Sequence, residues 1–298
     1  MLSTNIKEDF LNLFYHELKR ETLENANTLD LFILKVQNNS FSYDELIDQL
    51  GDKLCFFALS RIEVEALKAQ DRFNSLVKKA KSKFRDYSSN EGEFGEILLY
   101  CFLESHLKAP KLLTKLELKT ANNDYVKGAD GVHLLKLNDS DYQLVLGESK
   151  MRADLKQGIY DAFSSIGNLL SDGRKKLRFE LDLVNSQLVK EAFDDQAYSL
   201  LQNIILPSAR DDEYNLDYSF GIFLGFDINI TSQQQQLTNS EFRTNIRSTI
   251  KSEVLAVVDS INNQIRKEKF KGYSFYVYVI PFSDLAKTRK DVIENLIA

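Results

Sequence analysis

Two short polar motifs at the ends of neighbouring apolar runs carry the residue types needed to hydrolyse a phosphodiester. Asp130 follows Gly128-Ala129 at the start of one run, and Glu148 and Lys150 form a Glu-x-Lys motif at the end of the next. Carboxylate oxygens are the ligands that Mg²⁺ prefers, and a neighbouring lysine can orient water or offset charge growing on a phosphate. The motifs predict a metal-dependent nuclease in which Asp130 and Glu148 hold the cation and Lys150 is catalytic.

A β-hairpin is required to bring these motifs together. The runs 132–137 and 142–146 are rich in β-branched, aromatic and aliphatic residues, and a short polar cluster separates them. Side chains alternate along a strand, so Glu148 and Lys150 share a face. Asp130 shares that face only if even-numbered residues oppose even-numbered ones. An odd loop length such as three provides this register, whereas a two-residue loop would turn Asp130 to the other side.

A third acidic element lies upstream, in the segment 90–96. Asn90 is a plausible N-cap, and apolar residues follow at helical spacing to about residue 107, which predicts a helix. Glu93 and Glu96 share one face of this helix. Glu93 has an alternative role as the carboxylate of a capping box, whereas Glu96 stands among apolar residues, where burial is costly unless a cation or a donor receives it. We therefore predict Glu96 as a third catalytic and metal-ligating residue and leave Glu93 open.

Each half of the pattern also has an ordinary structural explanation. An aspartate after Gly-Ala at a strand start is often a turn residue, and a Glu-x-Lys at a strand end is often a solvated edge pair. The flanking apolar runs, the hairpin alignment and the third acidic element together favour the catalytic interpretation.

The order of these elements resembles a known nuclease superfamily. Over about residues 90–228 the chain is similar to the PD-(D/E)xK superfamily. The shared order is a helix with a Gly-Glu element, a strand, Gly-Ala-Asp, a strand, Gly-Glu-Ser-Lys and a second amphipathic helix. More narrowly, the segments 92–96, 128–133 and 147–150 resemble the HamA family, the effector subunits of the Hachiman anti-phage defence system. Ala129 stands where the superfamily usually has a proline.

The resemblance implies both a fold and an activity. The fold would be α/β, with a restriction-endonuclease-like αβββαβ core and a mixed central sheet. The activity would be that of a Mg²⁺-dependent endodeoxyribonuclease, with Mn²⁺ as the alternative ion, that cuts DNA within an antiviral complex. A helicase subunit, HamB, would hold it inactive until DNA is sensed. Two alternatives stay open: a stand-alone nuclease of the superfamily in repair or restriction, and a catalytically inactive scaffold, against which the intact Asp130, Glu148 and Lys150 argue.

Composition is that of an ordinary globular protein, with 298 residues of which 43% are hydrophobic and 28% charged. No apolar stretch is long enough to cross a bilayer and no signal-peptide pattern is present, so we expect a cytoplasmic protein without a membrane partner. Cys55 and Cys101 lie in apolar contexts typical of reduced thiols. The three histidines show no Cys/His clustering, which argues against a zinc site. His133, inside a strand, is expected to be packed or hydrogen-bonded.

The net charge of −6 is unusual for a protein that binds nucleic acid, because phosphate neutralisation normally requires a basic excess. Either local basic stretches, Lys78–Lys83 and Arg174–Arg178, face the DNA, or a partner brings the DNA to the site. Each stretch is also consistent with a solvated helix face.

The remaining pattern predicts two domains, a mainly helical one at 1–88, with partner binding as a hypothesis, and a nuclease domain at 89–298. Helices are predicted at 6–24, 43–50, 60–85, 154–170, 179–205 and 238–267 and at the C-terminus; strands are predicted near 29–36, at 218–230 in the sheet centre and at 273–282.

Overall fold

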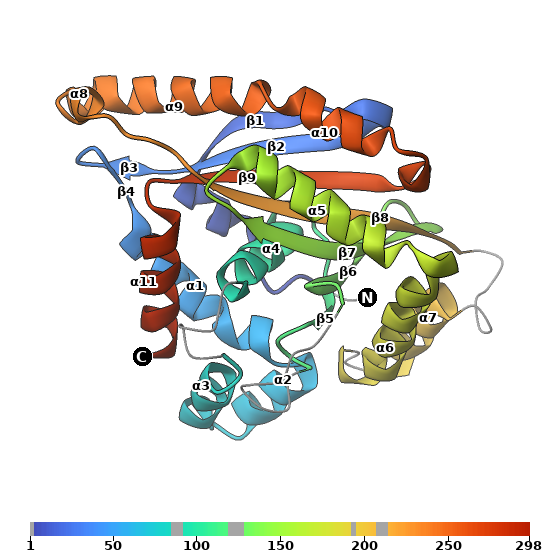
Figure 1. Ribbon diagram of the computed structural model, residues 1–298. Coiled ribbons are helices and arrows are strands. Elements are labelled where there is room, and N and C mark those ends of the chain that lie inside the picture. Colours follow the sequence, from blue (N-terminus) through green and yellow to red (C-terminus); the bar gives the residue numbers. More distant parts are fainter. Residues whose placement is uncertain (1–2, 85–91, 119–127, 192–194, 207–213) are drawn as a thin grey trace.

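A seven-stranded mixed sheet runs through the centre of the molecule (Figure 1). The computed structural model describes residues 3–84, 92–118, 128–191, 195–206 and 214–298. The strand order is β1-β2-β9-β8-β7-β6-β5. The strands are β1 (Phe14–Thr22), β2 (Thr28–Leu34), β5 (Lys111–Thr114), β6 (Gly131–Lys136), β7 (Asp141–Met151), β8 (Asn215–Asp227) and β9 (Ser274–Phe282), with a separate small pair β3 (Val36–Gln37) and β4 (Ser40–Phe41).

The four central strands β2, β9, β8 and β7 run parallel, and antiparallel strands flank them on both sides. The helices are α1 (Tyr43–Ala58), α2 (Arg61–Ala69), α3 (Phe73–Lys81), α4 (Glu93–Ser105), α5 (Leu155–Leu169), α6 (Lys175–Glu191), α7 (Asp195–Ile205), α8 (Ser232–Gln235), α9 (Asn239–Leu255), α10 (Val258–Ile265) and α11 (Leu285–Ile297), with short 3₁₀ turns η1 (Glu8–Leu13), η2 (Glu24–Ala26), η4 (Asp172–Arg174) and η5 (Glu268–Phe270). The order α4-β5-β6-β7-α5-β8, with α6 and α7 inserted before β8, confirms the predicted α/β class with an αβββαβ core and a mixed sheet.

Helices cover both faces of the sheet. Helix α5 packs on β7 and β8, and α10 packs against α5. Helix α9 packs on β1 and β2. Helix α4 packs against β7 and β8, and α1, α11 and η1 cover it from outside (Figure 1). All 13 residues of α4 are consequently buried, including its glutamates. A helix buried on every side can keep charged residues only if they are paired, so the positions of the α4 glutamates matter for the site.

The hairpin that carries the two motifs forms as predicted. The N–H of Leu137 donates to the carbonyl of Asp141 at 2.9 Å, which leaves three residues in the loop. Inside this loop the side chain of Asn138 accepts hydrogen bonds from the N–H groups of Ser140 and Asp141, a turn stabilised by its own asparagine. The odd loop length therefore sets the even-to-even register that the site requires.

Several local signals in the sequence are confirmed. Ser60 begins α2 with a capping box completed by Glu63. Asp154 caps α5, and its carboxylate accepts the N–H of Gln157 at 2.7 Å. Strand β8 lies in the middle of the sheet, as its density of apolar residues predicts. Asn90, the predicted N-cap of α4, lies outside the described residues.

The predicted helix at 6–24 is wrong, because residues 14–22 form the strand β1, paired antiparallel with β2. The apolar residues Ile6, Phe10, Phe14 and Leu18, all buried, recur every four residues. A spacing of four fits one face of a helix and also one face of a strand. Pairing with β2 decides between the two, and no local signal reports that pairing.

Two other predicted helices are interrupted. The helix expected at 60–85 ends at Ala69 and resumes at Phe73, since Asp71 has a φ of +54° that no helix accommodates. The helix expected at 238–267 is broken after Leu255 into α9 and α10. The long helix expected at 179–205 begins earlier and is described as α6 and α7.

The division into two domains stays a prediction, since its boundary falls at residues 85–91, outside the described part of the chain. The N-terminal region supplies β1 and β2 to the same sheet as the hairpin. A buried cluster of charges also joins it to the rest: Arg61 of α2 pairs with Glu191 of α6 at 3.2 Å, and the ammonium of Lys111 of β5 donates to the carbonyl of Leu59 at 2.7 Å.

Two smaller expectations can be compared with the structure. Both cysteines are free thiols, Cys101 buried and Cys55 half-buried. Within the described ranges, no helix combines the length and the apolarity that crossing a membrane demands.

Candidate active site

The β6–β7 hairpin brings the two predicted metal-ligating carboxylates to one end of the sheet. Gly131 and Gly147 form the last pair of the hairpin, and the N–H of Asp130, just before β6, donates to the carbonyl of the same Gly147 at 2.9 Å. Asp130 and Glu148 therefore flank this last pair, and both line one pocket. Gly147 has no room for a side chain, because a Cβ there would lie 3.0 Å from Leu99 of α4 and 3.2 Å from the Gly131 carbonyl.

Asp130 is held in place from two sides. Its Oδ2 accepts hydrogen bonds from the N–H of Ser149 at 2.7 Å and from the hydroxyl of Ser149 at 3.0 Å. Its Oδ1 lies 3.4 Å from the ammonium of Lys115, which follows β5. The carboxylate is only 11% exposed, so these contacts fix its orientation before any ligand arrives.

Glu148 carries the strongest electrostatic signal at the site. Its carboxylate pairs with the ammonium of Lys150, two residues on and on the same strand face, and accepts a hydrogen bond from Ser165 of α5. Burial is the largest cause that raises the pKa of Glu148 to about 7, and the negative charge of Asp130 raises it further. Two carboxylates that repel each other in a partly buried place form a site to which a divalent cation would be attracted.

Glu96 reaches the same site from the first turn of α4. The ammonium of Lys115 lies 3.7 Å from Glu96 Oε1 as well as 3.4 Å from Asp130 Oδ1, so the lysine stands between the two carboxylates. Glu96 and Asp130 also line a small cavity of about 10 Å³, which is close to the space that one water molecule needs. Glu93 lies buried in the same turn of α4.

The three predicted metal-ligating residues do not gather tightly in this structure. The oxygens of Asp130, Glu148 and Glu96 do not all lie within 4.8 Å of one another, a limit that another trio in the described part of the chain does meet. Mg²⁺ commonly takes only one or two carboxylates and keeps several waters. Asp130 and Glu148 alone supply that number, so the donor set fits a hard divalent cation.

A pocket of about 430 Å³ opens in front of these residues. Its charged lining comprises Lys115, Asp130, Glu148, Lys150 and Lys176, so three lysines face two carboxylates. The basic excess that is missing from the whole chain is therefore present locally. Such a pocket can receive a phosphate beside a cation site.

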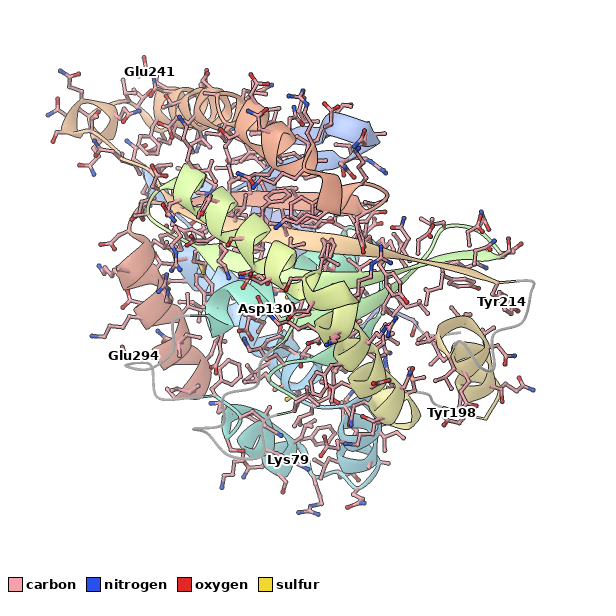
Figure 2. The ribbon with its side chains drawn as sticks, turned by 45° about the vertical axis from the view of Figure 1, so that its right-hand side comes forward. Lys79, Asp130, Tyr198, Tyr214, Glu241 and Glu294 are labelled. Atoms are coloured by element: carbon pink, nitrogen blue, oxygen red, sulfur yellow. The ribbon has the colours of Figure 1, made fainter. Side chains whose placement is uncertain are left out.

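The two basic stretches noted in the sequence have different positions. Lys176, from the stretch Arg174–Arg178, lines the pocket. Lys79, from the stretch Lys78–Lys83, pairs with Glu63 and lies on α3, well apart from Asp130 (Figure 2). One lysine of the first stretch thus reaches the pocket, whereas Lys79 of the second lies on an exposed helix surface.

Comparison with known families identifies the family of the chain. A family model described as HamA matches residues 8–296. The chain belongs to the HamA family. The resemblance seen in the short motifs is thereby confirmed over nearly the whole chain, and the protein is associated with Hachiman antiviral defence. No curated protein matches the chain.

The HamA-family chain brings further residues to the site that the sequence did not reveal. Lys115, Ser149 and Ser165 contact the predicted carboxylates, but Lys115 and Ser165 are isolated polar residues without a motif. Lys176 lies in a basic run that has an ordinary surface explanation. Only Ser149 had a sequence signal, since it separates Glu148 from Lys150.

Glu180 of α6 is the most informative of the residues that were missed. It is 4% exposed, and it accepts a hydrogen bond from the N–H of Ala129. Gly128 has a φ of +134°, and a Cβ there would lie 2.1 Å from Glu180 Oε1. Gly128 therefore has to be glycine, both for its backbone angle and for the close approach of this carboxylate. Burial raises the pKa of Glu180 to about 7.

Glu180→Gln is expected to stabilise the HamA-family protein at pH 8 but not at pH 5. The pKa of Glu180 is raised from 4.5 to about 7 in the folded state. Its protonated carboxyl therefore contributes its full stabilisation of the folded state below pH 4.5, and this stabilisation is lost as the pH rises through 7. Glutamine keeps an acceptor for Ala129 without that loss. We expect a gain of about 2 kcal/mol at pH 8, after allowance for solvent screening.

Chemical denaturation at the two pH values measures this effect. Asp182→Asn, on the exposed side of the same helix, is the matched control and should change stability equally at both. An equal gain for Glu180→Gln at pH 5 and pH 8 would contradict the raised pKa.

Proposed function

We infer that this HamA-family protein is a Mg²⁺-dependent DNase, the effector of an antiviral complex whose helicase partner holds it inactive until DNA is sensed. The observation that carries the inference is that Asp130, Glu148 and Lys150, at one end of the β6–β7 hairpin, line the same pocket. Family membership supports the defence context.

The donor set fits the expected ion. Asp130 and Glu148 would hold Mg²⁺, with Mn²⁺ as the alternative, and Glu96 shares the small cavity beside Asp130. When bound, the ion supplies a Lewis acid for the phosphate and lowers the pKa of water. It would also relieve the repulsion between the two carboxylates that raises the pKa of Glu148.

The protein's own groups account for the remaining steps. Ser149 holds Asp130 through two hydrogen bonds, so the carboxylate does not have to reorient on binding. Lys150, 22% exposed, lies at the pocket rim beside Glu148, from which it can orient water and offset charge that grows on the phosphate. Lys115 and Lys176 add positive charge that attracts the DNA backbone.

The overall charge supports the need for a partner. A chain of net charge −6 is repelled by DNA at long range, and the pocket lysines act only at short range, because salt screens charges beyond about 8 Å. A helicase that holds DNA would supply the missing affinity. An adjacent gene for such a helicase would favour this proposal over a stand-alone repair or restriction nuclease.

Plasmid nicking tests the proposal. Supercoiled DNA is incubated with the protein in Mg²⁺, in EDTA and in EDTA followed by excess Mg²⁺, each with and without the helicase, and a single-stranded RNA serves as the alternative substrate. We expect nicked or linear DNA in Mg²⁺, none in EDTA and recovery with added Mg²⁺. Cleavage that persists in EDTA, or no cleavage under any of these conditions, would contradict the proposal.

A further inference from the structure

A second cluster of metal-ligating side chains lies away from the pocket. His16 of β1, Asp30 of β2 and His106, the residue that ends α4, each offer an atom that lies within 4.8 Å of the other two. His16 Nε2 is 2.7 Å from Asp30 Oδ1, and His106 Nε2 is 3.8 Å from the same oxygen. None of the three lines the candidate active site. The histidines of this cluster are far apart along the chain, so sequence spacing, which argues against a zinc site, does not report it.

The spacing of these atoms is close to that of a zinc site. Ligands at 2.0–2.1 Å from a tetrahedral zinc ion lie about 3.3 Å from one another. The separations of the two imidazoles from Asp30, 2.7 Å and 3.8 Å, fall on either side of that value, and the two imidazoles lie within 4.8 Å of each other. Asp30 is 4% exposed, whereas His16 and His106 are 24% and 21% exposed. A solvent molecule can therefore complete the tetrahedron from outside.

The surroundings orient the histidines as metal ligands usually are. The ring of His106 meets the hydroxyl of Tyr278 at 3.2 Å through Nδ1, which leaves Nε2 toward Asp30. The ring of His16 stacks on Phe32 with centroids 4.1 Å apart, which limits its rotation. A hydrogen bond from the second ring nitrogen and a restricted ring are typical of histidines that bind zinc.

The neighbouring charged groups hold the carboxylate of the cluster and are themselves partnered. Lys108 pairs with Glu8 at 2.8 Å, so its charge is partly offset. The N–H of Arg20 donates to Asp30 Oδ1 at 3.0 Å and fixes that carboxylate.

We propose that His16, Asp30 and His106 form a binding site for Zn²⁺ or a similar divalent transition-metal ion. Two imidazoles and one carboxylate suit such an ion rather than Mg²⁺. Bound there, it would join the two N-terminal strands to the end of α4, the helix whose first turn carries Glu93 and Glu96. The site is separate in residues and in ligand chemistry from the acidic pocket, so it stands or fails independently of nuclease activity.

Metal binding by the full-length protein tests the proposal. Chelator-treated protein is titrated with Zn²⁺ by calorimetry in excess Mg²⁺, and Co²⁺ is added separately to record its visible spectrum. We expect one zinc per chain and the intense bands of tetrahedral cobalt. His16→Gln and His106→Gln should each weaken zinc binding by at least tenfold, since loss of an outer partner alone commonly has an effect of that size.

Matched variants separate this site from other sources of zinc binding. Tyr278→Phe should weaken binding about tenfold, whereas Tyr276→Phe, on the same strand and bonded to Gln143 instead, should not. Asp130→Asn should leave zinc binding unchanged. Circular dichroism of the metal-free variants confirms that each is folded. The proposal is overturned if the wild type binds no zinc, if Tyr278→Phe and both glutamine variants bind it as the wild type does, or if Asp130→Asn removes it.

Discussion

Asp130→Asn is expected to reduce Mg²⁺-dependent DNA cleavage by at least about 10³-fold, since a metal ion supplies several kcal/mol of transition-state stabilisation. Asparagine keeps an acceptor for the two hydrogen bonds from Ser149, so the local fold should persist. The substitution removes the negative charge of Asp130, one of the two carboxylates that line the pocket. We expect weaker Mg²⁺ binding together with the lost rate.

Initial nicking rates and Mg²⁺ titration calorimetry measure the two effects. Asp139→Asn is the matched control, because Asp139 lies in the loop of the same hairpin and is fully exposed. It should cleave and bind Mg²⁺ as the wild type does. An Asp130→Asn variant that cleaves at more than about a tenth of the wild-type rate would remove Asp130 from the site.

Lys150→Ala is expected to reduce the cleavage rate by about 10²–10³-fold while Mg²⁺ binding is retained. Lys150 contributes no metal ligand, and its ammonium pairs with Glu148 at the pocket rim. Removing it takes away the positive charge that pairs with Glu148 in the pocket. The loss should therefore appear in kcat more than in the Mg²⁺ concentration needed for half-maximal rate.

Lys136→Ala is the control for this variant, since Lys136 lies on the neighbouring strand and pairs with the exposed Asp139. Its nicking rate should match that of the wild type. If Lys150→Ala loses Mg²⁺ binding as Asp130→Asn does, the lysine positions the ligands and does not act on the reaction itself. Unchanged cleavage by Lys150→Ala would exclude it from catalysis.

The parts of the site that sequence could predict depend on short-range geometry. The alternation of side chains and the parity of the loop fix whether Asp130 and Glu148 share a face, and both follow from residues less than a hairpin apart. The capping box of Ser60 and the cap of Asp154 are equally local. The family resemblance also rests on short contiguous segments, and the family model extends it to residues 8–296.

The parts that could not be predicted depend on contacts between distant elements. Lys115 stands between Glu96 and Asp130 only because β5, α4 and β6 meet in space. Glu180 reaches the site from an amphipathic helix in which it is one of several acidic residues. The same reason explains the error at 6–24, where pairing with β2 outweighs a spacing that fits a helix.

The histidine cluster has a consequence for experiments that use chelators. If the histidine cluster binds zinc, EDTA removes two different ions, one from each site. Recovery of cleavage by Mg²⁺ alone would then assign the catalytic ion to the acidic pocket. Recovery that also needs Zn²⁺ would show that cleavage requires zinc bound at His106, at the C-terminal end of α4.

Strand β9 lies between β8 and β2, although it follows both of them in the sequence. A nascent or truncated polypeptide that stops before Ser274 would leave both of those neighbours with unsatisfied backbone groups. The sheet therefore cannot close until residues 274–282 have been synthesised. A fragment made of the pocket residues alone would expose an aggregation-prone edge, so the cleavage machinery of this protein cannot be expected to work as an excised piece.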